Sequence, residues 1–171
     1  VSDSRLALAQ LAAAFYAHPS RSLTLIGVTG TSGKGTTSHL IEAVLTAGGT
    51  PTGLIGTMGA RIGAETVPLE RTTPEAPDLQ YLLRRMVDAG VRVAVMEVAS
   101  HALVLHRVTG CRFAGAVFTN LTLDHLDFHK TLDAYRDAKR VLFAMVEPDG
   151  FAVINADDPY GPVMADASRA G

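Results

Sequence analysis

The stretch Leu23-Thr24-Leu25-Ile26-Gly27-Val28-Thr29-Gly30-Thr31-Ser32-Gly33-Lys34 decides the fold. Its first half is a nearly continuous apolar run, which is typical of a strand buried on both faces of a parallel sheet. A glycine-rich turn over residues 30–35 follows, and then a helical pattern over residues 36–47 that Gly48-Gly49 ends. A buried strand, a glycine turn and a helix in this order predict an α/β domain.

Outward from this stretch, strand and helix patterns alternate along the chain. The first predicted helix has Asp3 or Ser4 to cap it, and the third has Thr73 as its cap and Pro74 at its first position. The alternation predicts an α/β fold in which helices flank a mainly parallel sheet. Besides the central strand and helix, we expect strands over 53–57, 92–98, 114–119 and 151–155, helices over 4–16, 73–89 and 132–143, and a hairpin or a loop over 61–69.

Composition and charge limit the class of protein. The 171 residues fit one domain, and a 47% hydrophobic share is ordinary for a globular core. A net charge of -2 gives no electrostatic reason to expect nucleic acid or a membrane surface as partner. Cys111 is the single cysteine, so a disulfide framework is excluded and a reducing compartment is favoured. The apolar stretch 6–17 is too short to span a bilayer and lacks a basic leader. We therefore expect a soluble, cytoplasmic protein.

The glycine-rich turn is the strongest chemical signal. Between a buried strand and a helix, Gly-x-x-Gly-Lys lets backbone N–H groups face phosphate oxygens, with Lys34 reaching the outer phosphates. A plain glycine turn is the alternative. Two positions depart from the common P-loop: Val28 stands at its first glycine, and Gly35 stands where a Ser or Thr hydroxyl normally binds Mg²⁺. Thr36 substitutes only if the helix start shifts by one residue. The pattern predicts a P-loop nucleoside-triphosphate site.

Two further clusters follow predicted strands. Glu97 lies near the carboxyl end of one strand, where ligands bind in open α/β sheets and a carboxylate can hold Mg²⁺. Residues 119–129 contain two Asp and two His, which suits metal or phosphate chemistry but also a polar surface loop. An exposed strand-end Glu is the alternative for Glu97. For Lys139, periodicity alone favours a solvated lysine on a helix.

In this order, the clusters resemble the central ATP-binding domain of the Mur ligases, and most closely the MurE type, which joins an amino acid to UDP-N-acetylmuramoyl-L-alanyl-D-glutamate. The P-loop variant marks the wider family, which includes folylpolyglutamate synthetases, whereas Thr-Thr-Pro, Ser-His-Ala-Leu and Asp-His-Leu-Asp-Phe-His point to MurE. The resemblance runs from about residue 3 to residue 159, and it is carried by residues 27–34, 52–57, 72–74, 96–103, 118–129 and 154–158.

The resemblance implies roles for individual residues. It implies catalytic roles for Lys34, Glu97, His125 and Lys139. Mg²⁺ would be held by Glu97, His125 and, once carbamylated, Lys139. ATP would be bound by Gly30, Thr31, Ser32, Gly33, Lys34, Gly35 and Thr36, and the UDP-muramoyl-dipeptide by Thr72, Thr73, Ser100 and Arg107.

The chemistry that the resemblance implies is amide ligation through an acyl-phosphate, in the service of peptidoglycan synthesis, cell shape and cell division. The partners are then the UDP-muramoyl-dipeptide and an amino acid, and the protein is expected to be a monomer. Residues 1–20 would be the end of an N-terminal domain and a linker, and the turn-forming residues His18-Pro19-Ser20 would mark that linker. Residues 21–171 would be an incomplete central domain, with the C-terminal domain absent, so this chain alone is not expected to catalyse the reaction.

Three positions depart from the family pattern. Gly35 replaces the metal-binding Thr, Ala99 stands where the family has a substrate-contacting Ser, and Leu105 stands at a position that is polar in some members. They leave open another Mur or folylpolyglutamate-type ligase and a non-catalytic protein that binds nucleotide and precursor. A P-loop ATPase that couples hydrolysis to motion is a third alternative, for which no transducing segment is visible.

Overall fold

The computed structural model describes residues 2–168 and confirms the predicted α/β class. Within these residues a seven-stranded sheet has the order β4-β3-β2-β5-β1-β6-β7. Neighbouring strands from β2 through β7 in this order pair in parallel, and β3 and β4 add an antiparallel hairpin at one edge. The strands are β1 (Thr24–Thr29), β2 (Thr52–Gly56), β3 (Gly59–Ile62), β4 (Glu65–Val67), β5 (Val93–Glu97), β6 (Phe113–Phe118) and β7 (Val146–Ile154).

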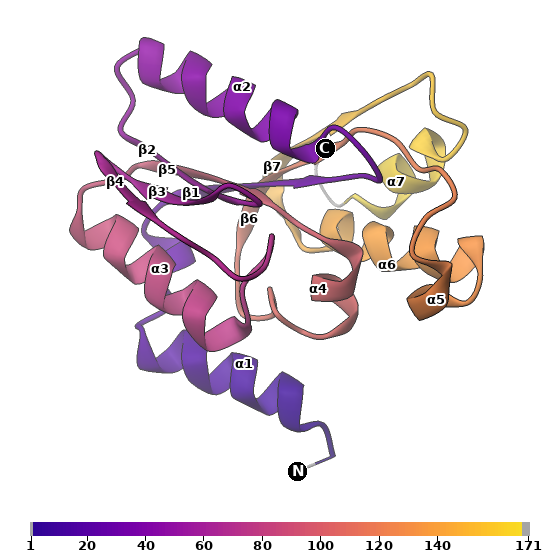
Figure 1. Ribbon diagram of the computed structural model, residues 1–171, viewed down its shortest axis with the longest axis horizontal. Helices are drawn as coiled ribbons and strands as arrows, with labels where there is room; N and C mark the ends of the chain where they lie inside the picture. Colours follow the sequence, from indigo (N-terminus) through magenta and orange to yellow (C-terminus); the bar gives the residue numbers. More distant parts are fainter. Residues whose placement is uncertain (1, 169–171) are drawn as a thin grey trace.

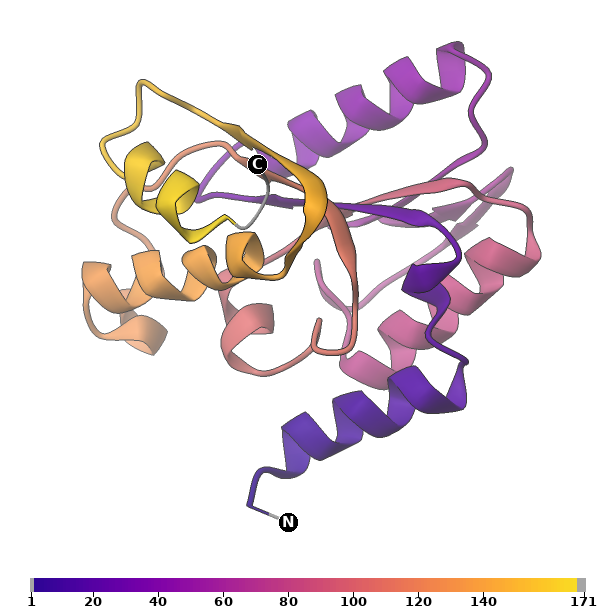
Figure 2. The same cartoon turned by 180° about the vertical axis from the view of Figure 1, so that it is seen from behind.

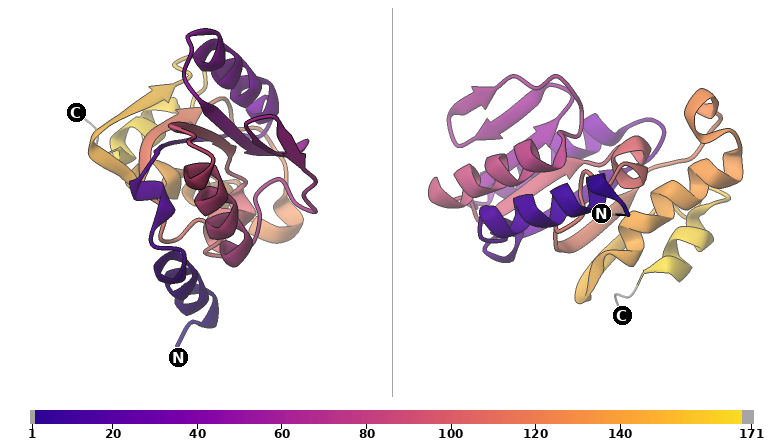
Figure 3. Two further views of the ribbon diagram at one scale, coloured as in Figure 1. Left: turned by 90° about the vertical axis from the view of Figure 1, so that its left-hand side faces the viewer. Right: turned by 90° about the horizontal axis from the view of Figure 1, so that it is seen from below.

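Helices cover both faces of the sheet unequally. Figure 1 shows α2 alone above one face and α3, α4 and α6 below the other, and the reverse view in Figure 2 agrees. The first helix lies farther out, packed against α3 (Figure 3). The helices are α1 (Ser4–Phe15), α2 (Lys34–Ala47), α3 (Ala76–Asp88), α4 (Ser100–Val104), α5 (Leu126–His129), α6 (Leu132–Ala144) and α7 (Gly161–Ala167), with a 3₁₀ turn, η1, at Pro19–Arg21.

The sheet separates a large hydrophobic core from a small one. Leu25 of β1 faces the large core, which α3 and α6 help to build. The next residue, Ile26, faces the small core beneath α2, as the alternation of side chains along a strand requires. The large core gathers residues such as Leu79, Leu83, Phe113, Leu142 and Phe143, whereas the buried residues of the small one are Ile26, Val28, Leu54, Val95 and Val117.

Two predicted helix starts were wrong. The second helix begins at Lys34 instead of residue 36, because Gly33 adopts φ 83° and serves as its N-cap. The third begins at Ala76, with Glu75 at the N-cap, and not at residue 74. Its predicted cap, Thr73, is used elsewhere: the hydroxyl donates to the Glu97 carbonyl at 2.9 Å and accepts from the Ala99 amide at 3.0 Å.

Other boundaries differ less. The hairpin or loop predicted over residues 61–69 is the β3–β4 hairpin, which begins two residues earlier, at Gly59, and ends at Val67. The last strand begins at Val146, earlier than the predicted residue 151, and the short helices α4, α5 and α7 were not predicted. Asp3, one of the two candidate caps, accepts from the Leu6 amide at 2.9 Å.

The N-terminal segment is tied to the rest of the domain. Within the predicted linker, Ser20 is buried and its hydroxyl accepts from the Arg112 amide at 3.0 Å. The domain boundary at residue 20 stays a prediction, and the outermost parts of the predicted ranges, residue 1 and residues 169–171, lie outside the described residues. Across residues 2–168, no helix has both the length and the apolar character needed to cross a membrane.

Candidate active site

The three clusters singled out in the sequence meet at one edge of the sheet. The glycine-rich turn follows β1, Glu97 ends β5, and residues 119–125 follow β6. Because β1 lies between β5 and β6 and pairs with both in parallel, the carboxyl ends of the three strands are adjacent. This is the edge at which open α/β sheets bind ligands.

Glycine is required at two positions of the turn. A Cβ at Gly30 would overlap the Thr119 hydroxyl, so this backbone approaches the β6 loop as closely as it does only without a side chain. Gly33 has φ 83°, a left-handed conformation that L residues rarely adopt. The turn therefore leads directly into the N-terminus of α2. There the free backbone N–H groups and the helix dipole favour an anion.

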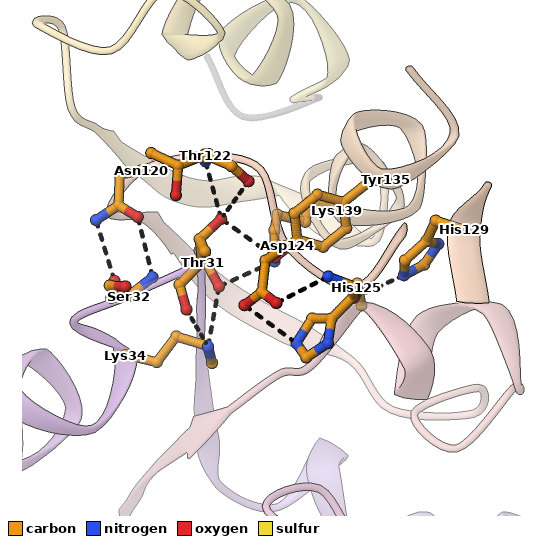
Figure 4. A network of polar contacts seen from close by, with 12 residues as sticks. Thr31, Ser32, Lys34, Asn120, Thr122, Asp124, His125, His129, Tyr135 and Lys139 are labelled. Carbon is orange, nitrogen blue, oxygen red and sulfur yellow. Dashed lines mark hydrogen bonds and ion pairs between the residues drawn. The ribbon is translucent and has the colours of Figure 1, made fainter. Parts of the chain in front are cut away.

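The loop after β6 braces this turn (Figure 4). The Asn120 carbonyl accepts from the Thr31 amide at 2.8 Å, and its side-chain oxygen accepts from the Ser32 amide at 3.0 Å. The Thr119 hydroxyl donates to the Ser32 carbonyl at 2.7 Å, and the Thr31 hydroxyl contacts Tyr135 Oη at 3.2 Å. The amides of Thr31 and Ser32 are thus bonded inside the protein, and a phosphate would meet N–H groups farther along, at the start of α2.

Lys34 is folded back onto its own turn. Its ammonium group donates to the carbonyls of Gly30 at 2.9 Å and Thr31 at 3.0 Å. Burial lowers the pKa of Lys34, while the charges of Glu97 and Asp124 raise it. The two carbonyls therefore hold the lysine beside the space into which a phosphate chain would enter.

Glu97 is a buried carboxylate and not an exposed strand-end residue. Its Oε1 accepts from the Thr57 amide at 2.8 Å, and its Oε2 accepts from the Thr57 hydroxyl at 3.3 Å. A Cβ at Gly35 would lie 3.4 Å from Glu97 Oε1, so the carboxylate directly faces the start of α2. A cleft of about 580 Å³ opens here, lined by Gly33, Lys34, Gly35, Thr36, His39, Thr57, Met58 and Glu97.

Lys139 of α6 is buried as well, so the reading of a solvated lysine is wrong. Its ammonium donates to the Gly30 carbonyl at 2.9 Å and lies 4.3 Å from the centre of the Tyr135 ring. Burial, followed by repulsion from Lys34, lowers the pKa of Lys139 to about 7, against an opposing contribution from Asp124. A large share of the side chain is then a neutral amine near neutral pH, which is the nucleophilic form.

His125 is placed differently from the other predicted metal ligands. It is exposed, has φ 52°, and its Nε2 lies 3.6 Å from Asp124 Oδ2, with the ring turned toward that carboxylate in Figure 4. Its ring also lies 4.9 Å from that of His101. Within residues 2–168 no three or more His, Cys, Asp or Glu side chains form a group that could hold a metal.

The fit to Mg²⁺ is therefore partial. Mg²⁺ is commonly bound by one or two carboxylates together with substrate phosphates and water, and Glu97 beside the start of α2 suits that arrangement. His125, directed at Asp124 and His101, does not complete a ligand set with it. Glu97 fits a metal ion better than His125 does, and the metal roles of Glu97, His125 and Lys139 all stay predictions.

The predicted precursor-binding residues lie beside the same edge. Thr72 Oγ1 is 3.0 Å from Thr57 Oγ1, next to Glu97. The Ser100 hydroxyl lies 2.9 Å from His129 Nε2, and both residues are buried. Buried Arg107 donates from Nη1 to the Thr73 carbonyl at 3.3 Å. The hydroxyls of Thr73 and Ser100 and the guanidinium of Arg107 are thus engaged internally, whereas Thr72 is partly exposed. The binding of a precursor by these four residues stays a prediction.

Sequence reasoning missed several residues that shape the site. The Thr57 amide donates to the Glu97 carboxylate, and the Asn120 side chain accepts from the Ser32 amide. The Tyr135 ring lies against the Lys139 ammonium group. Asn120 and Thr57 both occur in stretches that the resemblance had picked out, but their partners lie far away in sequence. Glu75, which pairs with Arg107 at 2.9 Å, carried no signal besides its place after Thr-Thr-Pro.

Comparison with known proteins points to one family. The family model described as the Mur ligase middle domain matches residues 28–170. The UDP-N-acetylmuramoyl-L-alanyl-D-glutamate–2,6-diaminopimelate ligase of Chlorobaculum tepidum is 58% identical over 165 residues, which are 96% of this chain and 32% of that protein. The ligase of the same name from Geobacter metallireducens is 48% identical over 171 residues, which cover 96% of this chain and 34% of that protein.

A solved structure agrees. That of a UDP-N-acetylmuramoyl-L-alanyl-D-glutamate–2,6-diaminopimelate ligase superposes with a TM-score of 0.85 at 33% identity, over 98% of this chain and 34% of that one. The chain therefore spans about a third of the length of the curated relatives that it matches.

Proposed function

The chain belongs to the Mur ligase family through its middle domain, and from this premise we propose that it is the nucleotide-binding part of a ligase that adds the third amino acid to UDP-N-acetylmuramoyl-L-alanyl-D-glutamate. The observation that carries the proposal is the meeting of a phosphate-binding turn, a buried carboxylate and a buried lysine at one sheet edge, in Lys34, Glu97 and Lys139. Relatives at up to 58% identity bear the name of a diaminopimelate ligase, so 2,6-diaminopimelate is the amino acid that we propose.

The proposed reaction has two steps. A carboxylate of the precursor takes the γ-phosphoryl group of ATP, and ADP leaves. The amine of the amino acid then attacks the acyl carbon, phosphate departs, and an amide bond forms. Magnesium, when bound, would neutralise charge on the phosphoryl oxygens.

The residues of this chain bind and position the reactants. The turn and the start of α2 would receive the phosphates, and Lys34 would leave the Gly30 and Thr31 carbonyls to contact them. Thr72 and Arg107 lie on the Glu97 side of the same edge and would hold the precursor. Because little covalent chemistry falls to the protein in phosphoryl transfer, this positioning and the electrostatics would supply most of the rate.

The test is ADP release by the full-length protein that carries this middle domain, with Mg²⁺ and UDP-N-acetylmuramoyl-L-alanyl-D-glutamate. Diaminopimelate, lysine and ornithine are compared, with a folate substrate as control for the folylpolyglutamate-type alternative. Release that requires both the precursor and diaminopimelate is the expected result. Release with folate alone would reassign the protein within the family.

A non-catalytic binding protein is the second candidate, favoured by Gly35 and Ala99. It is supported if ATP and the precursor both bind and no amino acid elicits ADP. We expect the middle domain, produced by itself, to bind nucleotide without turnover. A monomeric state, a cytoplasmic location and the lack of nucleic-acid and membrane partners stay predictions.

A further inference from the structure

Three arginines converge on one carboxylate beside the proposed precursor site. Glu75 Oε1 lies 2.9 Å from Arg107 Nη2 and 3.8 Å from Arg71 Nε, and Glu75 Oε2 lies 3.1 Å from Arg5 Nη1. These arginines come from α1, from the segment before α3 and from the segment after α4. A single carboxylate thus pairs with three arginines that are distant from one another in sequence. Other carboxylates lie nearby, because Asp3 interacts with Arg5, and Glu70 and Asp78 line the cavity beside Arg71.

Glu75 is an unusual residue for its position. It is the N-cap of α3, where Ser, Thr, Asp and Asn are preferred because their short side chains accept hydrogen bonds from the first turn. The Glu75 side chain makes no capping bond and turns instead toward the arginines. The carboxylate thus makes no hydrogen bond to the helix end, although its charge suits the helix dipole, and its ion pairs are those with the cluster.

Arg107 is incompletely satisfied by this arrangement. Its side chain is largely buried, and its Nε–H is enclosed without a hydrogen-bond partner among the described residues. Glu75 meets the guanidinium through Nη2, while Nη1 goes to the Thr73 carbonyl. A carboxylate that is free to align with the guanidinium edge takes Nε and Nη2 together, in the bidentate geometry that arginine favours.

The cluster borders a cavity of about 360 Å³. Arg71, Tyr81 and three carboxylates, those of Glu70, Glu75 and Asp78, are among its lining residues. The residue after Arg71 is Thr72, whose hydroxyl bonds with Thr57 of the nucleotide cleft.

We propose that Glu75 is a placeholder carboxylate, which occupies Arg107, Arg71 and Arg5 in the free protein and is displaced by the non-reacting carboxylate of the ligand. This inference rests on the proposed function, because the D-glutamate end of that precursor carries two carboxylates, of which one reacts. The displacement couples ligand binding to release of Glu75, so Glu75 weakens binding and makes occupancy of the arginine cluster selective for a carboxylate.

The test measures binding of UDP-N-acetylmuramoyl-L-alanyl-D-glutamate by calorimetry to the native protein and to Glu75→Gln, Glu75→Ser and Glu70→Gln. Glu75→Ser restores a good helix cap, so it controls for loss of folding. Glu70 lines the same cavity and makes no ion pair among the described residues, so Glu70→Gln is the matched control. Both Glu75 variants are expected to bind about three- to tenfold more tightly, and Glu70→Gln as the wild type does.

A second readout does not depend on the precursor. Glutarate, a plain dicarboxylate, is titrated while the Nε–H signal of Arg107 is followed by NMR, with Arg107→Lys to assign it. We expect a shift that saturates at lower glutarate in Glu75→Gln than in the wild type.

The two failures are distinguishable. If the precursor binds the wild type but binds the Glu75 variants equally or more weakly, Glu75 positions Arg107 and the placeholder role is overturned, while the proposed function stands. If no form binds the precursor and glutarate still binds Glu75→Gln more tightly, the proposed function fails and the placeholder role holds. If neither ligand binds more tightly to the variants, the inference is wrong.

Discussion

At the scale of single residues, Gly35 stands where the common P-loop has a Ser or Thr after its lysine. A side chain there would point at Glu97, because a Cβ on Gly35 would lie 3.4 Å from Glu97 Oε1, an ordinary contact distance. The glycine therefore leaves the carboxylate without a neighbouring hydroxyl in the first turn of α2, at the place where a metal bound to phosphates would be expected.

The pair Gly35→Ser and Gly35→Ala isolates that hydroxyl. Both variants should raise the free energy of unfolding by up to ~1 kcal/mol, because glycine is unfavourable in a helix. Gly35→Ser should bind ATP about three- to tenfold more tightly than Gly35→Ala when Mg²⁺ is present, since the hydroxyl adds a metal ligand. Titration calorimetry with Mg²⁺ and with EDTA measures this. An equal gain in EDTA would show that the hydroxyl contacts nucleotide and not metal.

Lys139 predicts a pH dependence of stability. Its pKa is about 7 in the folded protein, against 10.5 as the ordinary value, because it is buried and close to Lys34. Between these values the unfolded chain binds more protons than the folded one, so stability rises with pH; below pH 7 the full penalty for the buried charge is present.

Urea unfolding at pH 6 and pH 9 compares the wild type with Lys139→Met. The gain in stability from pH 6 to pH 9 should be larger in the wild type by about 2 kcal/mol, because the variant lacks this titration. Lys130→Met, at an exposed lysine, serves as control and should follow the wild type. Parallel pH profiles for wild type and Lys139→Met would mean that Lys139 keeps its charge at pH 9.

At the scale of elements, the turn after β7 holds the loop that braces the phosphate-binding turn. Buried Asp158 accepts from the Leu121 amide at 2.8 Å and from the Tyr160 amide at 2.9 Å. Asn155 donates to the Thr119 carbonyl at 2.8 Å. The turn after β7 therefore holds the loop after β6, and that loop in turn holds Thr31 and Ser32 of the phosphate-binding turn.

Asp158→Ala should break this support. It leaves the buried Leu121 amide without its charged partner, so we expect the free energy of unfolding to fall by about 2–3 kcal/mol. Nucleotide affinity should fall as well, because Asn120 no longer fixes Ser32. The exposed neighbour Asp157→Ala is the matched control for both measurements. Denaturant unfolding and ATP binding are compared, and a stability loss with unchanged affinity would separate the loop from the nucleotide site.

The sequence was sufficient where local pattern and tertiary role agree. The strand, turn and helix around Lys34 were predictable because burial, glycine placement and helix punctuation coincide there. The start of α3 was not, since the Thr73 hydroxyl serves β5 through Glu97 and Ala99. The early part of β7 was also missed: Glu147-Pro148-Asp149-Gly150 resembles a turn, but proline is tolerated in an edge strand, and β7 is the last strand of the sheet.

The site could be predicted as a set of stretches but not as contacts. The resemblance selected Lys139, yet periodicity favoured a solvated lysine, because nothing in α6 alone shows that the Gly30 carbonyl and the Tyr135 ring enclose it. Arg107 was also named, while Glu75 was not, since an ion pair across 32 residues leaves no local pattern (107 − 75). Pairings between distant segments are what the structure adds.

At the scale of the whole molecule, the two faces of the sheet are held with unequal strength. The α6 side buries Tyr135, Ala138, Lys139, Leu142 and Phe143 of that helix in or beside the large core. In α2 the buried residue is Ser38, and Leu40 and Val44 are 61% and 71% exposed. The helix that carries the start of the phosphate site therefore rests on the small core, with few apolar contacts to keep it in place.

Hydrogen exchange of the native protein should reveal this difference. Amides in the middle of α2 should exchange at least about tenfold faster than those in the middle of α6, after correction for intrinsic rates, because α2 can open without disturbing the large core. Saturating ATP should slow exchange in α2 far more than in α6, since a ligand stabilises the state that binds it. Lys34→Met, which weakens phosphate contacts without touching either core, controls for effects unrelated to binding. Equal exchange in the two helices would mean that the domain opens only as one cooperative unit, and that nucleotide binding is not coupled to ordering of α2.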